Sequence, residues 1–242
     1  MTCTVILTAA GTGTRLGHAL PKALVPLDGT PLVAHAARRL AAAPSVDQLV
    51  VTAPAGYVDD VRRAVEAHLG RDIPVLVVPG GASRQESVAR GLAAIDLEGV
   101  ADDEVVLVHD AARSLAPADL VERVVAAVHA GHPGVIPVLP VTDTVKRVGP
   151  DGPDGAPVVA TVPRGDLRRV QTPQGFRRDV LLAAHAAQSA LAGDEATAAT
   201  DDAALLEAAG HEVWAVAGDE LAMKITTRRD LAVAAVLTEE GA

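Results

Sequence analysis

Short runs of β-branched and aliphatic residues alternate along this chain with segments whose apolar residues recur at helical spacing. Five runs predict buried strands, over residues 4–8, 48–53, 74–78, 104–109 and 135–138. The segments between them place an apolar residue on each successive turn, as at Val58, Val61 and Val65. Because parallel strands need a crossover connection, and a helix usually supplies it, the alternation predicts an α/β fold whose mostly parallel sheet carries helices on both faces.

The alternation breaks after about residue 139. Residues 140–157 are dense in proline, glycine and aspartate, and they separate two short extended pieces around Val145 and Val159. A bare loop of this length is unusual inside a compact domain, so we expect residues 139–165 to form a protruding β-arm that either pairs with a partner or is mobile.

The α/β pattern resumes beyond the arm. It predicts three further elements, a helix over residues 179–190, a strand over 212–217 and a final helix over about 228–238. We therefore expect a single domain over residues 1–242, with the arm as an element within it.

Composition excludes several classes of protein. With 242 residues and 49% hydrophobic content, the chain can bury a large core and is not expected to be disordered. Its net charge of −10 opposes nucleic-acid binding, which depends on many Lys and Arg side chains neutralising phosphates. No apolar run reaches the roughly 18 to 20 residues that span a bilayer, so no membrane association is expected.

The single cysteine, Cys3, excludes an internal disulfide and a thiolate zinc cluster. The first residues enter a strand-like stretch without a basic leader. We therefore expect a cytoplasmic protein.

The turn that follows the first predicted strand is rich in small residues. It has the sequence AAGTGTRL over residues 9–16, at the carboxyl end of a strand, where open parallel sheets bind their ligands. Small residues allow backbone N–H groups to approach phosphate oxygens. The turn is thus either a phosphate-binding loop or a glycine-rich turn that only reverses the chain.

Two common phosphate-binding loops do not match this turn. Its glycines have the spacing G-x-G-x-x-x-G rather than G-x-G-x-x-G, and the second strand ends in VTAP over residues 51–54, with no acidic residue for a ribose hydroxyl. The chain also has no G-x-x-x-x-G-K-[ST] sequence. These features disfavour a dinucleotide site and a Walker-type site, and they leave a phosphate-binding turn supplemented by Arg15 and Lys22.

Asp110 closes the fourth predicted strand, at the same edge of the sheet. A single carboxylate together with phosphate oxygens and waters suits Mg²⁺, although a helix-capping role fits an aspartate there as well. The neighbouring His109 is expected to be structural, because histidine is a poor magnesium ligand. Helix starts are predicted at Thr30-Pro31 and at Ser83, which has capping-box spacing to Glu86.

The turn resembles the signature of nucleotidylyltransferases, through Ala9-Ala10-Gly11-x-Gly13-x-Arg15 followed by Pro21-Lys22. Further fragments narrow the resemblance to the 2-C-methyl-D-erythritol 4-phosphate cytidylyltransferase family, and they occur in order at GGASRQESV (80–88), VHDAAR (108–113), DTVK (143–146), TVPR (161–164) and QTPQ (171–174). The resemblance extends from residue 4 to about residue 235 and implies a Rossmann-like sheet of the nucleotide-diphospho-sugar transferase type.

The resemblance implies a reaction in which the phosphate of the acceptor attacks the α-phosphorus of CTP. The products are 4-diphosphocytidyl-2-C-methyl-D-erythritol, an intermediate of the non-mevalonate isoprenoid pathway, and pyrophosphate. A phosphate monoester is largely dianionic at neutral pH, so this nucleophile needs no protein base. Catalysis then rests on positioning and charge stabilisation, with Mg²⁺ as the expected cofactor.

Site roles follow from the same resemblance. The implied catalytic residues are Arg15, Lys22 and Lys224. The implied nucleotide-binding residues are Ala9, Ala10, Gly11, Gly13, Gly81, Arg84, Ser87, Asp110 and Ala111, with Asp110 also the metal ligand. Read without the resemblance, Lys22 is a solvated loop side chain, Lys224 is a charge at a strand edge, and Ser83 and Arg84 only complete a helix end.

Arg113, Thr144 and Arg164 are the implied substrate-binding residues for methylerythritol phosphate. In the family, the arm reaches across a dimer, so the resemblance implies a homodimer whose acceptor site combines two subunits. The alternative is an exposed hairpin with incidental charges.

Several positions depart from the family pattern, namely Thr8, Ser114, Pro163 and Ala222. The last two put acceptor geometry and nucleotide affinity in question. Two other functions stay open, a ribitol 5-phosphate cytidylyltransferase and a non-catalytic nucleotide-binding module.

Overall fold

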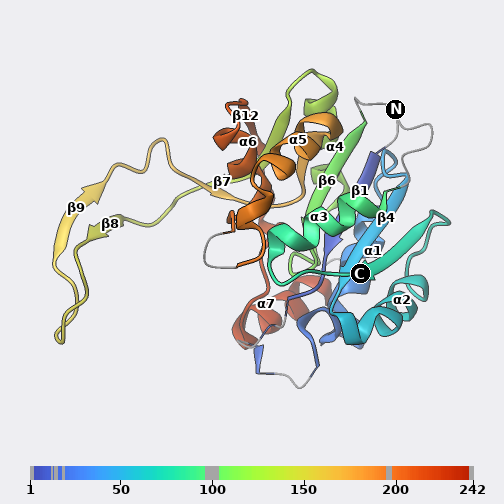
Figure 1. Cartoon of the computed structure of the whole chain (residues 1–242). Coiled ribbons are helices and arrows are strands. Elements are labelled where there is room, and N and C mark those ends of the chain that lie inside the picture. The colour runs from blue at the N-terminus through green and yellow to red at the C-terminus, as the bar shows by residue number, and fades with distance from the viewer. Residues whose placement is uncertain are drawn as a thin grey trace.

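A computed structural model describes residues 3–11, 13, 16–17, 20–95, 104–194 and 198–239. Strands from the whole length of the chain form one eight-stranded sheet in this structure (Figure 1). Its strands are β1 (Cys3–Thr8), β4 (Gln48–Ala53), β5 (Val75–Pro79), β6 (Val105–Asp110), β7 (Gly134–Pro140), β10 (Arg168–Val170), β11 (Gln174–Arg177) and β12 (Val213–Ala217).

Strand β1 lies at the centre of the sheet, with β6 on one side and β4 on the other, both parallel to it. Beyond β4 lies β5, also parallel. Beyond β6 lies β11, which in turn pairs with β7. Strand β10 pairs with the same edge of β7 as β11 does, and β12 pairs with the opposite edge of β7. The predicted α/β fold with a mostly parallel sheet is confirmed.

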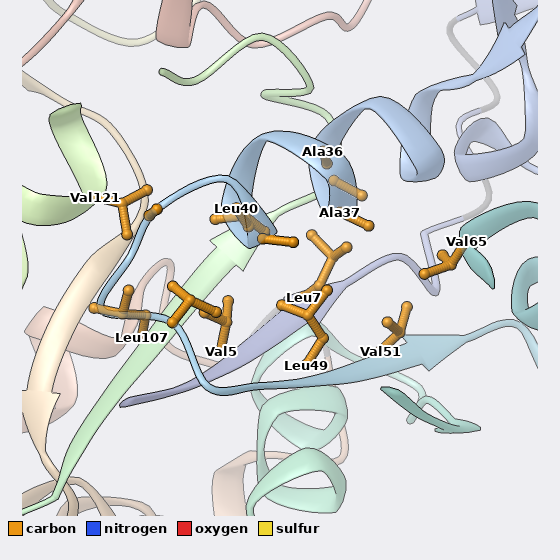
Figure 2. Close-up of a cluster of buried hydrophobic side chains, with 14 of the residues drawn as sticks. Val5, Leu7, Ala36, Ala37, Leu40, Leu49, Val51, Val65, Leu107 and Val121 are labelled. Atoms are coloured by element: carbon orange, nitrogen blue, oxygen red, sulfur yellow. The ribbon is translucent and has the colours of Figure 1, made fainter. Parts of the chain in front are cut away.

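Alternate residues of the strands build two separate cores. Val5 and Leu7 of β1 face helices α1 (Leu32–Ala41), α2 (Val58–Glu66) and α4 (Ala118–His129), as Figure 2 shows. Ile6, between them in sequence, faces the opposite layer. That layer contains α3 (Arg84–Ala94), α5 (Arg178–Ala187) and α6 (Asp202–Ala208). The period of two in a strand therefore explains why both faces need a covering layer of helices.

The five predicted strands agree with the structure to within two residues at each end. The prediction that Thr30 caps a helix was wrong, because Thr30 and Pro31 form β3 (Thr30–Pro31) and pair with β2 (Pro26–Leu27). Helix α1 therefore starts at Leu32 without a side-chain cap. The predicted cap at Ser83 was confirmed, since its hydroxyl accepts a hydrogen bond from the Glu86 amide at 3.0 Å.

Strands β8 (Val145–Val148) and β9 (Val158–Val162) form a two-stranded antiparallel sheet of their own. Figure 1 shows this hairpin well away from the large sheet, to which it is joined through β7 and β10. Three of its valines, Val148, Val158 and Val159, are exposed, with 63% of the surface of both Val158 and Val159 accessible. The extended pieces expected around Val145 and Val159 are thus present.

The last described element is α7 (Arg228–Glu239), and it is preceded by the short helical turn η5 (Glu220–Ala222). Among the helices that the structure describes, none has the length and apolar character required to cross a membrane.

Candidate active site

A cavity of about 660 Å³ opens at the carboxyl ends of β1 and β6, beside the start of α3. Most of the residues implicated by sequence line it. They are Ala9, Ala10, Gly11, Gly13, Lys22, Gly81, Arg84, Ser87, Asp110, Ala111 and Lys224. The structure therefore brings together four stretches of chain that are far apart in sequence. Arg15 falls outside the described residues.

The turn after β1 packs directly against Lys22. Gly13 has a φ of +66°, a left-handed conformation that L side chains rarely adopt, and a Cβ there would lie 2.3 Å from Lys22 Cβ. Lys22 begins the short helical turn η2 (Lys22–Leu24), and its carbonyl accepts the Val25 amide at 3.1 Å. The glycine thus allows the lysine stem to lie against the turn.

The loop before α3 forms the opposite wall. The Gly81 amide donates to Ser87 Oγ at 3.0 Å, and that hydroxyl donates to the Ser83 carbonyl at 2.8 Å. A Cβ at Gly80 would lie 2.3 Å from the Cβ of Ala10, so this loop touches the turn after β1. Ser87 therefore shapes the wall as well as lining it.

Asp110 lies between two cations. Lys224 Nζ is 2.8 Å from Asp110 Oδ2, and Arg84 Nε is 3.1 Å from Oδ1. Burial alone would raise the pKa of the Asp110 carboxyl, but the positive charges of Arg84 and Lys224 outweigh burial and hold that pKa well below its usual range. The carboxyl group is ionised throughout the physiological range.

Thr8, one of the departures from the family pattern, contributes to this cluster. Its hydroxyl lies 3.2 Å from the His109 carbonyl and 3.4 Å from Asp110 Oδ1. The threonine thus places a hydroxyl donor beside the carboxylate.

Lys224 is held at the cavity by its neighbours. The Ile225 amide donates to the Ala112 carbonyl at 2.8 Å, which anchors this segment beside the loop after β6. Gln171 exchanges two hydrogen bonds with the backbone of Asp219, at 2.7 Å and 2.9 Å. The backbone on both sides of the lysine is therefore tied to the segments that follow β6 and β10.

His109 is fully buried and takes no place in the cavity lining. Its Nε2 lies 3.2 Å from the Arg113 carbonyl, so Nε2–H donates there, and its Nδ1 accepts from the Thr172 hydroxyl at 3.0 Å. Burial is the largest cause that lowers the pKa of His109, to about 4. The ring is neutral, in agreement with the structural role expected for it.

The three implied acceptor-binding residues do not line this cavity. Arg113 donates to the Ala222 carbonyl at 2.7 Å and to the Val170 carbonyl at 3.1 Å. Thr144 and Arg164 are exposed on the arm. In the described part of this chain, the residues implied for the nucleotide line one cavity, and the residues implied for the acceptor do not.

Ala222, the departure of most concern, is fully buried against Ala116 and Leu120 and does not line the cavity. Its carbonyl, rather than its side chain, makes the contact with Arg113. An apolar residue suits this position.

Sequence reasoning missed Asp202 and His185. Arg84 Nη1 is 2.7 Å from Asp202 Oδ2, and His185 Nε2 is 2.9 Å from Asp202 Oδ1. The sequence showed only two aspartates before an apolar run, which is the pattern of a helix start. It gave no sign of a contact with an arginine 118 positions away.

The side chains of the cavity suit a hard cation whose coordination shell comes mainly from the phosphates of a bound substrate. No group of three or more His, Cys, Asp or Glu side chains that could hold a metal occurs among the described residues. Asp110 is ionised and lines the cavity. One carboxylate, with substrate phosphates and waters completing the shell, fits Mg²⁺ better than it fits zinc.

Comparison with known proteins gives a consistent result. A sequence profile of the family described as 2-C-methyl-D-erythritol 4-phosphate cytidylyltransferase matches residues 3–240. A protein of that description from Streptomyces avermitilis is 47% identical over 232 residues, covering 95% of this chain and 88% of its own. One from Saccharopolyspora erythraea is 49% identical over 236 residues, covering 97% of this chain and 98% of its own.

Solved structures agree. The crystal structure of 2-C-methyl-D-erythritol 4-phosphate cytidylyltransferase from Thermus thermophilus superposes with a TM-score of 0.74 at 34% identity, covering 99% of this chain and 100% of its own. That of 4-diphosphocytidyl-2C-methyl-D-erythritol synthase from Anaerococcus prevotii gives 0.79 at 25% identity, covering 98% of both chains. The likeness therefore covers the arm as well as the large sheet.

Proposed function

The chain belongs to the 2-C-methyl-D-erythritol 4-phosphate cytidylyltransferase family, and from this premise we propose that it transfers CMP from CTP to 2-C-methyl-D-erythritol 4-phosphate. A phosphate oxygen of the acceptor forms a bond to the α-phosphorus of CTP, and the bond from that phosphorus to the bridging oxygen breaks. Pyrophosphate leaves with the electron pair. The products are 4-diphosphocytidyl-2-C-methyl-D-erythritol and pyrophosphate, and the step belongs to isoprenoid synthesis.

The observation that carries this proposal is the charge of the cavity. In a chain with a net charge of −10, Lys22, Arg84 and Lys224 line one cavity together with a single carboxylate. A triphosphate carries several negative charges that must be compensated when it leaves water. Such a cavity suits a nucleoside triphosphate, and the base would lie by the small residues Ala9, Ala10 and Gly81.

In this proposal Lys22 and Lys224 hold the triphosphate and compensate the charge that grows on the oxygens around the α-phosphorus. Arg15 would join them from the turn. Each cation acts through position, because the attacking phosphate is already deprotonated and no side chain has to remove a proton. When bound at Asp110, Mg²⁺ would neutralise phosphate charge.

We place the acceptor between two subunits. The arm, on which Thr144 and Arg164 are exposed, extends away from the large sheet of its own chain (Figure 1), and three of its valines are exposed. A second subunit would cover those valines and receive the two polar side chains at its own cavity. We therefore propose that the protein is a homodimer and that it acts in the cytoplasm on small-molecule substrates.

The test is product identification. We expect the purified protein, supplied with Mg²⁺, methylerythritol phosphate and each nucleoside triphosphate in turn, to give the CDP-alcohol with CTP, as detected by mass spectrometry. Conversion of ribitol 5-phosphate in place of methylerythritol phosphate would contradict the proposed acceptor. Tight CTP binding without any product would contradict catalysis.

A pair of variants connects the activity to the cavity. Lys22→Ala should lower turnover by on the order of 100-fold or more, because its charge acts mainly in the transition state. Arg63→Ala is the control, since Arg63 pairs with Asp60 on the exposed face of α2 and lies outside the cavity. Equal rates for the two variants would remove the role proposed for Lys22.

A further inference from the structure

Behind the cavity, a row of ion-paired and hydrogen-bonded side chains continues into the interior of the protein. Asp110 is bound by Arg84, Arg84 is bound by Asp202, and Asp202 is bound by His185. With Lys224 at the other end, the row alternates hydrogen-bond donors and carboxylates from the cavity to the space between α5 and α6. Asp202 is therefore connected to the cavity although it does not line it.

Asp202 is the most deeply buried carboxylate of this row, with none of its surface exposed. Burial alone would raise the pKa of its carboxyl, but the charge of Arg84 and the hydrogen bond from His185 keep that pKa below its usual range. A buried carboxylate with a partner on each oxygen is held in one orientation.

Among the described residues, Arg84 contacts two carboxylates. Its Nε is 3.1 Å from Asp110 and its Nη1 is 2.7 Å from Asp202, on carboxylates that come from β6 and α6. Because the guanidinium group is planar, two contacts from two elements fix both its position and its plane. The shorter contact is the one to Asp202.

Helix α6 does not depend on Asp202 for its start. Asp201 is the N-cap, and its carboxylate accepts the Ala204 amide at 3.1 Å and Gln174 Nε2 at 2.7 Å. Both oxygens of Asp202 are therefore left to bind Arg84 and His185 rather than the helix backbone.

From this geometry we propose that Asp202 is a positioning residue for the transfer reaction. It holds Arg84 against Asp110, so that neither side chain has to reorient when the triphosphate enters. Without its negative charge, Arg84 turns toward the phosphates of the bound nucleotide and Asp110 loses its fixed partner. The proposal rests on the proposed function, because it concerns the same cavity.

The sign of the charge change predicts how the kinetic parameters separate. Replacing Asp202 with a neutral residue makes the surroundings of the cavity more positive, so binding of an anionic nucleotide is not weakened. The alignment of Arg84 and Asp110 in the transition state is lost, and this lowers kcat. A residue that only stabilised the fold would leave the kcat of the folded fraction unchanged.

The test uses Asp202→Asn, which keeps the shape and removes the charge. We expect kcat to fall about 10- to 100-fold, while the Kd for CTP, measured by calorimetry, does not rise by more than about threefold. Asp202→Glu restores the charge and should recover part of kcat. The control is Glu104→Gln, because Glu104 is a carboxylate of similar burial just before the other end of β6, where it accepts the Thr4 hydroxyl at 2.9 Å.

If Asp202→Asn does not fold, His185→Leu tests the proposal instead, because this change removes the hydrogen-bond donor to Asp202 and leaves the contact between Asp202 and Arg84 in place. We expect a fall in kcat of about three- to tenfold with CTP binding retained. An unchanged kcat in a folded variant, or the same kcat loss in Glu104→Gln, would overturn the proposal. A wild-type protein that binds CTP without forming product would instead overturn the proposed function.

Discussion

At the scale of single residues, Gly13 shows why the turn after β1 needs a glycine. Its backbone is left-handed, with φ at +66°, and the space for a side chain is filled by the stem of Lys22. The sequence predicted close approach of the backbone to a phosphate. The structure adds a second reason, which is the packing of the lysine that the proposal makes catalytic.

Gly13→Ala should therefore affect both stability and turnover. The left-handed conformation alone costs about 1 kcal/mol for an L side chain, and displacement of Lys22 should lower turnover by about 10-fold or more. Denaturant unfolding and a pyrophosphate-release assay measure the two effects.

Gly29→Ala separates these effects, because Gly29 has a φ of +79° and nothing within 4 Å of a new Cβ. It should lose a similar amount of stability and keep full turnover. A Gly13→Ala enzyme as active as Gly29→Ala would show that the lysine does not depend on the glycine.

Some site residues could be predicted from the sequence, and others could not. Asp110 ends a predicted strand, so its position at the edge of the sheet follows from that strand, whereas Lys22 was assigned through the motif that resembles the family signature. Asp202 reaches Arg84 across 118 positions, through the packing of α6 on the sheet. That contact depends on tertiary structure, and no local pattern specifies it.

At the scale of elements, the buried parallel strands were predictable because their apolar runs are continuous. Strands β10 and β11 could not be predicted in this way, because their sequences, RRV and QGFR, contain few β-branched residues. They are strands because β7 and β6 offer them partners, in an antiparallel direction that sequence does not encode locally. Helix α6 was missed because it has only seven residues.

The arm allows a test by mixing variants. Lys22→Ala disables the cavity and leaves the arm intact, and Arg164→Ala does the reverse. If each arm serves the cavity of its partner, a mixed dimer contains one intact site. Random exchange of equal amounts should then restore about one quarter of wild-type activity, whereas each variant alone is nearly inactive.

No recovery after confirmed subunit exchange would show that the arm serves its own cavity or neither. Recovery requires the two subunits to share a site, so size-exclusion chromatography with light scattering should also report a dimer. A monomeric protein with full activity would exclude this role of the arm.

At the scale of the whole molecule, buried ionisable groups make stability depend on pH. His109 is fully buried and has a pKa lowered from 6.5 to about 4, with burial as the main cause. Below pH 6.5 the unfolded chain binds a proton at this histidine that the folded protein does not. The stabilising contribution is therefore complete above that pH and is lost as the pH falls toward 4.

We expect this group to remove about 3 kcal/mol from the free energy of unfolding between pH 7 and pH 4. Urea denaturation in metal-free buffer measures it, and His109→Gln should flatten that part of the profile. His129→Gln, at an exposed position on α4, should keep the profile of the wild type. Identical profiles for both variants would show that His109 does not carry the pH dependence.

The cavity also differs in charge from the rest of the chain. The whole chain carries a net charge of −10, whereas three cationic side chains line the cavity.

The most direct test is a crystal structure of the protein with CTP and Mg²⁺. We predict the triphosphate between Lys22 and Lys224, the base against Ala10 and Gly81, and Asp110 within reach of the ion. Nucleotide bound anywhere else, with this cavity filled only by solvent, would contradict the account.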